Sequence, residues 1–175
     1  MRFLLPALLA LALVSPALAQ ADAALTSADR LAAIVIGFAG DRTAMLNNNE
    51  TGNVTRDGPG KFSGTAEESG ASFTFEVVEG TTPCVFAATF VNGEALFRLE
   101  VDVNKIKAFN FEELEAQAGF TMYALTLDAA EGAVVAISPD GTRNNAGGAN
   151  RMGTSLTLDE LNGAAAELQE ACPPA

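Results

Sequence analysis

The sequence contains no histidine and no tryptophan among its 175 residues, and it has a single tyrosine, Tyr123. Without histidine the chain lacks the usual general base, the commonest metal ligand and the middle member of most nucleophilic triads. Without tryptophan it offers few flat platforms on which sugars could stack. Any catalysis would therefore depend on carboxylates, on Tyr123, or on one of the lysines Lys61, Lys105 and Lys107.

Motifs that bind cofactors or activate nucleophiles are also missing. There is no Gly-x-Ser-x-Gly elbow, and the Asp and Asn residues do not have the spacing of an EF-hand loop. The segment 58–61 resembles the end of a phosphate-binding loop. However, Phe62 stands where Ser or Thr would hold magnesium, and Thr55 replaces the leading glycine. We therefore expect no cofactor and no metal.

Acidic residues are densest at Glu112, Glu113 and Glu115. A glycosidase needs two carboxylates that face each other across the substrate, whereas neighbouring glutamates on one helix diverge. We interpret this cluster as the solvated face of a helix, and we predict no catalytic residue.

The sequence has no long apolar run. Residues 3–14 are apolar except for Pro6, a stretch of about 12 residues where a membrane-spanning helix needs roughly 20. Arg2 precedes this stretch, and the small residues of Ala17-Leu18-Ala19 follow it, as a signal peptidase requires. We therefore expect residues 1–19 to be a secretion signal that is cleaved before Gln20. Residues 20–175 would form a single exported domain without stable membrane insertion, located in the periplasm or secreted.

Basic residues are scarce. The chain has 10 Lys and Arg against 22 Asp and Glu, a net charge of -12, and the loss of Arg2 with the signal would leave 9 against 22, or -13. Such a charge repels phosphate backbones and anionic membrane surfaces, so we expect no nucleic-acid partner. We interpret the acidity mainly as a source of solubility.

The chain has two cysteines, Cys84 and Cys172. An even pair in an exported protein favours a disulfide over free thiols. Strand alternation turns Cys84 inward, and helical spacing turns Cys172 inward, so the two can meet in the core. On the loop-entropy model such a bridge stabilises the fold by roughly 4–5 kcal/mol.

Helical periodicity marks both ends of the exported domain. Leu31, Ile34, Val35 and Phe38 form one apolar stripe after a cap at Thr26 or Ser27, although a short buried strand over 34–38 is an alternative. At the C-terminus, Thr157 and Glu160 form a capping box. The apolar positions of the helix that follows are Leu158, Leu161, Ala165, Leu168 and Cys172.

Between the helices the apolar period is two. Phe73, Phe75 and Val77 predict a half-buried strand, and Asn92-Gly93 predicts a type I′ hairpin between 84–91 and 94–103. In that hairpin Phe90 would face Ala95, Phe86 would face Leu99, and Cys84 would lie opposite Val101. We further expect a short helix over 110–118, strands over 120–128 and 133–138, and a turn at 139–141. Surface loops are expected over 47–60, with one short strand near 53–56, and over 142–153.

Five of the nine basic residues of the exported domain lie in or beside these two polar loops. If the loops converge, their side chains would form a positive rim for a carboxylate, a phosphate or the acidic patch of a partner. The alternative is that charged residues simply decorate surface loops. The rim residues are Arg42, Arg56, Lys61, Arg143 and Arg151.

These observations predict an α+β fold, an antiparallel sheet of five to seven strands with the N- and C-terminal helices packed on one face. The leading functional hypothesis is a non-catalytic binding or interaction protein, whose partner is an unknown protein or a small anionic ligand. One alternative is a hydrolase or isomerase that uses carboxylates. The other is a carrier of a small apolar ligand, with a cavity lined by Phe86, Phe90 and Phe97.

Overall fold

The computed structural model describes residues 25–46, 50–93, 95–117, 119–147 and 149–174, so the predicted signal peptide lies outside the described residues. The fold is α+β, and every pair of neighbouring strands is antiparallel. The elements are α1 (Ser27–Ile36), β1 (Arg42–Met45), β2 (Thr51–Gly58), β3 (Lys61–Ala66), β4 (Ser72–Glu79), β5 (Val85–Asn92), β6 (Ala95–Asp102), the 3-10 turn η1 (Val103–Lys105), β7 (Ile106–Gln117), β8 (Phe120–Ala129), β9 (Val134–Ile137), β10 (Arg143–Asn145), β11 (Ala149–Thr154) and α2 (Leu158–Ala171).

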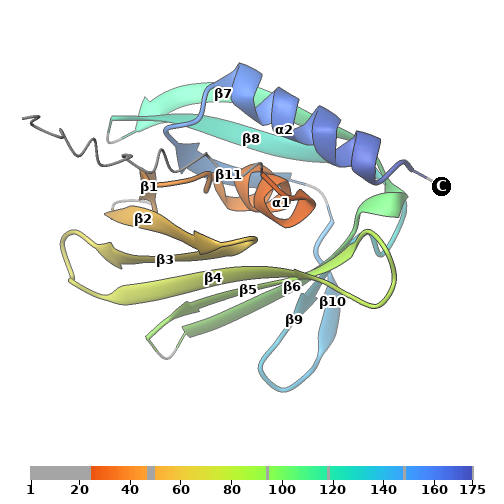
Figure 1. Ribbon diagram of the computed structural model, residues 1–175, viewed down its shortest axis with the longest axis horizontal. Helices are drawn as coiled ribbons and strands as arrows, with labels where there is room; N and C mark the ends of the chain where they lie inside the picture. The colour runs from red at the N-terminus through yellow and green to blue at the C-terminus, as the bar shows by residue number, and fades with distance from the viewer. Residues whose placement is uncertain (1–24, 47–49, 94, 118, 148, 175) are drawn as a thin grey trace, which may run out of the picture.

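The strands form two sheets rather than the single sheet of five to seven strands that the sequence predicts (Figure 1). The larger sheet has eight strands in the order β1-β2-β3-β4-β5-β6-β9-β10, and the smaller has three in the order β11-β8-β7. The helix α1 contacts α2, β4 and β11, and α2 contacts β7. The expected strand count was too low because two segments predicted as loops and one predicted as a helix are strands.

Both terminal helices start at the predicted caps, but α1 ends at Ile36, so Phe38, which was expected on its apolar stripe, lies beyond the helix, and the alternative strand over 34–38 is not formed. Thr26 caps α1 in a capping box with Asp29, and the C-cap of the helix is Gly37, whose φ is 74°. Thr157 and Glu160 form the same arrangement at the start of α2. The side chains of Leu161, Ala165 and Leu168 on α2 are buried, as their spacing predicts.

The predicted hairpin between β5 and β6 is present, but its register differs by two residues. Asn92 pairs with Ala95 instead of lying in the loop, and Phe90 faces Phe97. Phe86, not Cys84, lies opposite Val101. A shift of two residues keeps every side chain on its face of the sheet, so the apolar pattern alone could not distinguish the two registers.

The two segments predicted as polar loops are largely strands. The first contains β2, which is much longer than the short strand expected there, and the second contains β10 and β11. Two of their glycines, Gly52 and Gly153, lie within strands at close contacts instead of in turns. A Cβ on Gly52 would lie 2.7 Å from a methyl group of Leu46, and one on Gly153 would lie 2.8 Å from the sulfur of Met45. Residues 47–49 and 148 lie outside the described residues.

The short helix predicted over 110–118 is wrong, because this segment belongs to the twelve-residue strand β7. Asn110 and Glu113 have the spacing of a capping box, which misled the prediction. In the fold β7 pairs with β8 along its length, with Phe109 opposite Leu127 and Phe111 opposite Leu125. Tertiary pairing thus overrides a local capping signal. Ala118 lies outside the described residues.

The predicted disulfide between Cys84 and Cys172 is confirmed, and it links residues 88 positions apart in the sequence. Cys84 is buried, but it directly precedes β5 and has a φ of 63° instead of an extended conformation. Cys172 ends α2 at the buried position that its spacing predicts. The bridge therefore ties the C-terminal helix to the start of the central hairpin. None of the helices in the described residues is long and apolar enough to cross a membrane.

Candidate functional site

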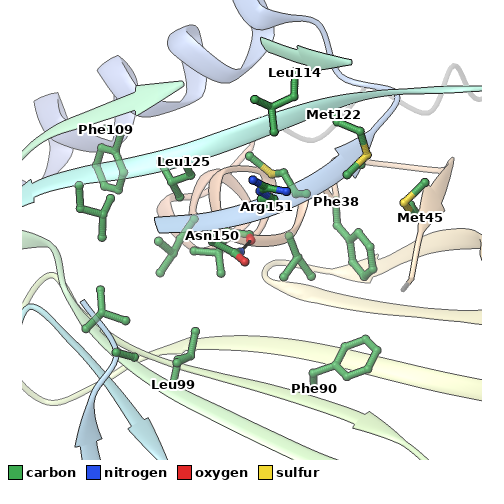
Figure 2. Close-up of a pocket in the computed structure, with 18 of the residues that line it drawn as sticks. Phe38, Met45, Phe90, Leu99, Phe109, Leu114, Met122, Leu125, Asn150 and Arg151 are labelled. Carbon is green, nitrogen blue, oxygen red and sulfur yellow. Dashed lines mark hydrogen bonds between the residues drawn. The ribbon is translucent and has the colours of Figure 1, made fainter. Parts of the chain in front are cut away.

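A wide cleft of about 870 Å³ lies between the two sheets, beside α1 (Figure 2). Its floor comes from the larger sheet, where Phe90 on β5 and Phe97, Leu99 and Val101 on β6 point to the same side. In Figure 2, Phe90 and Leu99 lie across the open space from Leu114 and Met122 of the smaller sheet. The volume falls within the roughly 300–1,000 Å³ typical of small-molecule sites.

The opposite wall and the end of the cleft are equally apolar. Phe109, Leu125 and Leu127 come from β7 and β8, and Leu31 and Val35 come from α1. Strand alternation explains why Leu125 and Leu127 line the cleft together, since they are two residues apart and share a face of β8, whereas Met122 lines it from the other face. The cleft is thus built from segments that are distant in sequence, and each contributes the apolar side of an amphipathic element.

The cleft is open to solvent along one side. Phe97 lines it and is 50% exposed, although its neighbour on the same face, Leu99, is buried. Ala116, Gln117 and Ala146 also line the cleft and are exposed. An apolar ring in contact with water at such an opening leaves hydrophobic surface that a ligand would cover.

Methionines surround one end of the cleft. The sulfurs of Met45 and Met122 both approach Gly153, and a Cβ at that glycine would lie 2.8 Å and 2.9 Å from them. Met152 lines the same region and is buried. Methionine side chains are flexible and polarizable, so they adapt to apolar molecules of different shape.

Few polar groups line the cleft. On β11, Asn150 donates a hydrogen bond from its side-chain amide to the carbonyl of Val35, 2.9 Å away, which fixes it against the end of α1. Arg151 follows it, is exposed, and makes no ion pair with any described residue. Glu115 and Gln117 on β7 also line the cleft. Figure 2 shows Asn150 and Arg151 between Leu99 and Leu114.

Of the five predicted rim residues, Arg151 alone lines the cleft. The other four each pair with a carboxylate on a different element, and these contacts leave the predicted binding role of the rim untested. Their pairs are Arg42–Glu160, Arg56–Asp29, Lys61–Glu76 and Arg143–Glu100.

Asp29 is the one acidic residue that is buried in the described part of the chain. Burial alone would raise its pKa, but hydrogen bonds from Arg56, Thr26 and Gly60 outweigh burial and lower the pKa to about 2. The Arg56 guanidinium contacts both carboxylate oxygens, at 2.9 Å and 2.8 Å. This carboxylate is fully occupied in joining α1 to β2 and lies outside the cleft lining, so it is a structural group.

The other residues considered for catalysis also have structural or solvent-facing positions. Glu112, Glu113 and Glu115 lie on β7, not on a helix, and all three are exposed. Tyr123 is buried, and burial together with the negative charge of Glu113 raises its pKa. Within the described ranges, no group of three or more Asp, Glu or Cys side chains has an arrangement that could hold a metal ion.

Comparison of the chain with protein-family models, with curated proteins and with solved structures finds no match. The site therefore has to be interpreted from its own geometry. Two of the three phenylalanines expected in a carrier cavity, Phe90 and Phe97, line the cleft. The third, Phe86, is buried in the core and is absent from the lining. Sequence reasoning missed Leu114 because the segment around it was expected to be a helix.

Proposed function

We propose that this chain is an exported, non-catalytic binding protein that holds a small apolar ligand in the cleft between its two sheets. The observation that carries the proposal is the cleft itself, with its apolar floor and walls and its opening at Phe97. The proposal combines two hypotheses from the sequence, namely the leading one of a binding protein and the alternative of a carrier for an apolar ligand. We also propose that α1 and α2, which contact each other, pack together on one face of the fold and leave the cleft mouth open.

Burial of apolar surface supports this proposal energetically. Each square ångström of apolar area removed from water stabilises a complex by about 25 cal/mol, before the cost of immobilising the ligand. Phe97 is half exposed and Leu114 partly exposed at the cleft, so a ligand there would cover surface that water now contacts. An interior packed without space would offer no such gain.

The carboxylate-based enzyme has less support. A hydrolase of that kind needs two carboxylates on opposite sides of its substrate. Glu115 is the acidic residue on the cleft lining, and the buried Asp29 is committed to Arg56. The lysines Lys61 and Lys105 are likewise paired, with Glu76 and Asp102.

The proposed location is the periplasm or the extracellular space. The signal-like segment 1–19 and the Cys84–Cys172 disulfide support it, since disulfides persist in oxidising compartments. Expression with the native N-terminus in a bacterium, followed by intact-mass measurement of the exported fraction, tests this proposal. The expected mass corresponds to a chain that starts at Gln20 with no free thiol. An uncleaved chain in the cytoplasm would contradict it.

The binding proposal is tested with Nile red, an uncharged dye whose fluorescence rises in apolar surroundings. We expect saturable binding with one dye molecule per chain. The variant Phe97→Glu should weaken binding roughly tenfold or more, because it places a charge where the ligand buries apolar surface. Its matched control is Val78→Glu, since Val78 is 49% exposed, close to the 50% of Phe97, and is absent from the cleft lining.

The control should bind the dye as the unaltered protein does, and far-UV circular dichroism should show that both variants are folded. Equal dye binding by both variants would refute the cleft as the site. A complete absence of dye binding by the unaltered protein would remove the support for a carrier of apolar ligands.

A further inference from the structure

Arg151 has an unusual position among the basic residues of this chain. Six Lys and Arg side chains in the described ranges form ion pairs with carboxylates, and Arg98, Lys107 and Arg151 form none. Of these three, Arg151 alone lines the apolar cleft. A guanidinium beside apolar walls is a strong donor for a ligand carboxylate, because it offers two parallel N–H groups to the two oxygens.

The acidic residue on the same cleft stands apart from Arg151. Arg151 lies opposite Ala124 on β8, whereas Leu114, next to Glu115, lies opposite Met122. Glu115 is therefore about three residues along the sheet and two strands across it from Arg151. That separation is on the order of 14 Å between Cα atoms. The two Cα atoms are thus farther apart than the Debye length of about 8 Å at physiological salt, and screening over such a distance weakens the attraction between the two charges.

The surroundings of Arg151 indicate what the rest of the ligand would be. The cleft lining around Arg151 is apolar: Met122, which pairs with Gly153, shares the face of Arg151, and Met152 and Leu125 line the cleft from the opposite face of their strands. The Asn150 amide is already bound to the carbonyl of Val35. The cleft thus combines one available cation with a long apolar surface. The net charge of -12 repels anionic ligands, but salt screens this repulsion beyond about 8 Å. Within the cleft, a ligand carboxylate near β11 would meet the positive charge of Arg151.

We propose that the ligand is an amphipathic monocarboxylic acid, with its carboxylate bound by Arg151 and its apolar chain along the cleft. This inference rests on the proposed binding function and names the class of ligand for the same site. A free acid fits better than an uncharged apolar molecule, which would leave Arg151 without a partner.

The test compares three probes that share a ten-carbon chain and differ in the head group: decanoate, decan-1-ol and decyltrimethylammonium. Each probe is titrated against the Nile red complex at pH 7.5, where decanoate is ionised, and the loss of dye fluorescence measures its binding. We expect decanoate to bind roughly tenfold or more tightly than the alcohol, since a hydrogen bond to a charged group contributes about 1.5–3 kcal/mol. The ammonium compound should bind most weakly.

The variant Arg151→Met retains the apolar length of the side chain and removes its charge. We expect it to bind decan-1-ol as before and to lose the preference for decanoate. The matched control is Arg98→Met, because Arg98 is also exposed, forms no ion pair among the described residues and is absent from the cleft lining. This control makes the same change in net charge and should keep the preference.

The outcomes separate the two proposals. If the alcohol binds as tightly as decanoate, if the preference survives Arg151→Met, or if Nile red binds but decanoate fails to displace it, the carboxylate inference is overturned and the binding function stands. Tighter binding of the ammonium compound than of the alcohol would also overturn it, and would indicate that Glu115 dominates. If neither Nile red nor any probe binds, the proposed function itself fails.

Discussion

Replacing Asp29 with asparagine should make the fold less stable by an amount that depends on pH. Asp29 is fully buried at the start of α1 and accepts hydrogen bonds from three residues. These are the Thr26 backbone and hydroxyl at 2.8 Å and 2.7 Å, the Arg56 guanidinium, and the backbone N–H of Gly60 at 2.9 Å. The carboxylate thus joins the first helix to β2 and to the turn that follows it.

The magnitude follows from the pKa of this carboxyl. Burial opposes ionisation, but the hydrogen bonds outweigh it and lower the pKa from the ordinary 3.8 to about 2. A pKa difference of one between the folded and unfolded protein corresponds to about 1.4 kcal/mol, so ionised Asp29 stabilises the fold by roughly 2–3 kcal/mol. Because the pKa is lower in the folded protein, this contribution is complete above about pH 5 and is lost as the pH falls through 3.8 towards 2.

Asp29→Asn removes the charge and leaves the Arg56 guanidinium, whose side chain is 17% exposed, without its partner. We expect a loss of about 3 kcal/mol at pH 7, towards the lower end of the 3–5 kcal/mol typical of broken buried pairs, since asparagine keeps an oxygen acceptor. Urea unfolding followed by far-UV circular dichroism at pH 7, 5, 4, 3 and 2 measures the free energy of unfolding.

The gap between the unaltered protein and Asp29→Asn should narrow below pH 4. Asp57→Asn, a change at an exposed position on the same strand as Arg56, is the matched control and should alter stability by less than about 0.5 kcal/mol. A gap that is equally large at pH 7 and pH 2, or a cost below about 1 kcal/mol at pH 7, would refute the linkage between the ionised carboxylate and stability.

Two further predictions concern the backbone and the disulfide. Gly60→Ala should lower the free energy of unfolding in urea by about 2 kcal/mol or more, because the φ of Gly60 is 65° and a Cβ there would meet the carbonyl of Val77. Gly70 has a similar φ of 67° but open space around it, so Gly70→Ala should lower it by only about 1 kcal/mol. Equal costs would show that the close approach at Gly60 is unimportant. Replacing both Cys84 and Cys172 with serine should lower the free energy of unfolding by roughly 2–5 kcal/mol, and a thermal transition unchanged from that of the oxidised protein would contradict this role.

The sequence predicted features that depend on a few neighbouring residues. The capping boxes at Thr26 and Thr157 mark where the helices start, since the donors and acceptors lie three residues apart. The disulfide followed from the number of cysteines and from the inward positions inferred for both. The hairpin was found from Asn92-Gly93, although the true register, in which Asn92 pairs with Ala95 and Phe90 lies opposite Phe97, depends on the rest of the sheet.

Local sequence patterns did not predict the strands that are rich in polar residues. In β2, exposed polar residues alternate with the buried Gly52 and Val54, so the composition suggested a loop although the pairing with β3 makes this segment a strand. In β7, a capping pattern competed with pairing to β8, and pairing prevailed because it buries Phe109 in the core. Long-range hydrogen bonds and burial decided both segments, and neither is visible in a window of ten residues.

By itself, the sequence determined where the two terminal helices start, the cysteine pair, and the lack of histidine chemistry, because each depends on residue identity or short spacing. Only the tertiary structure decided that the strands divide into two sheets and that the cleft between them is lined from β1, β5, β6, β7, β8, β9, β11 and α1. The same strand alternation places Phe86 and Phe97 on one face, yet the first is buried and the second is half exposed. What separates them is whether another element covers that part of the sheet, and only packing between distant segments determines this.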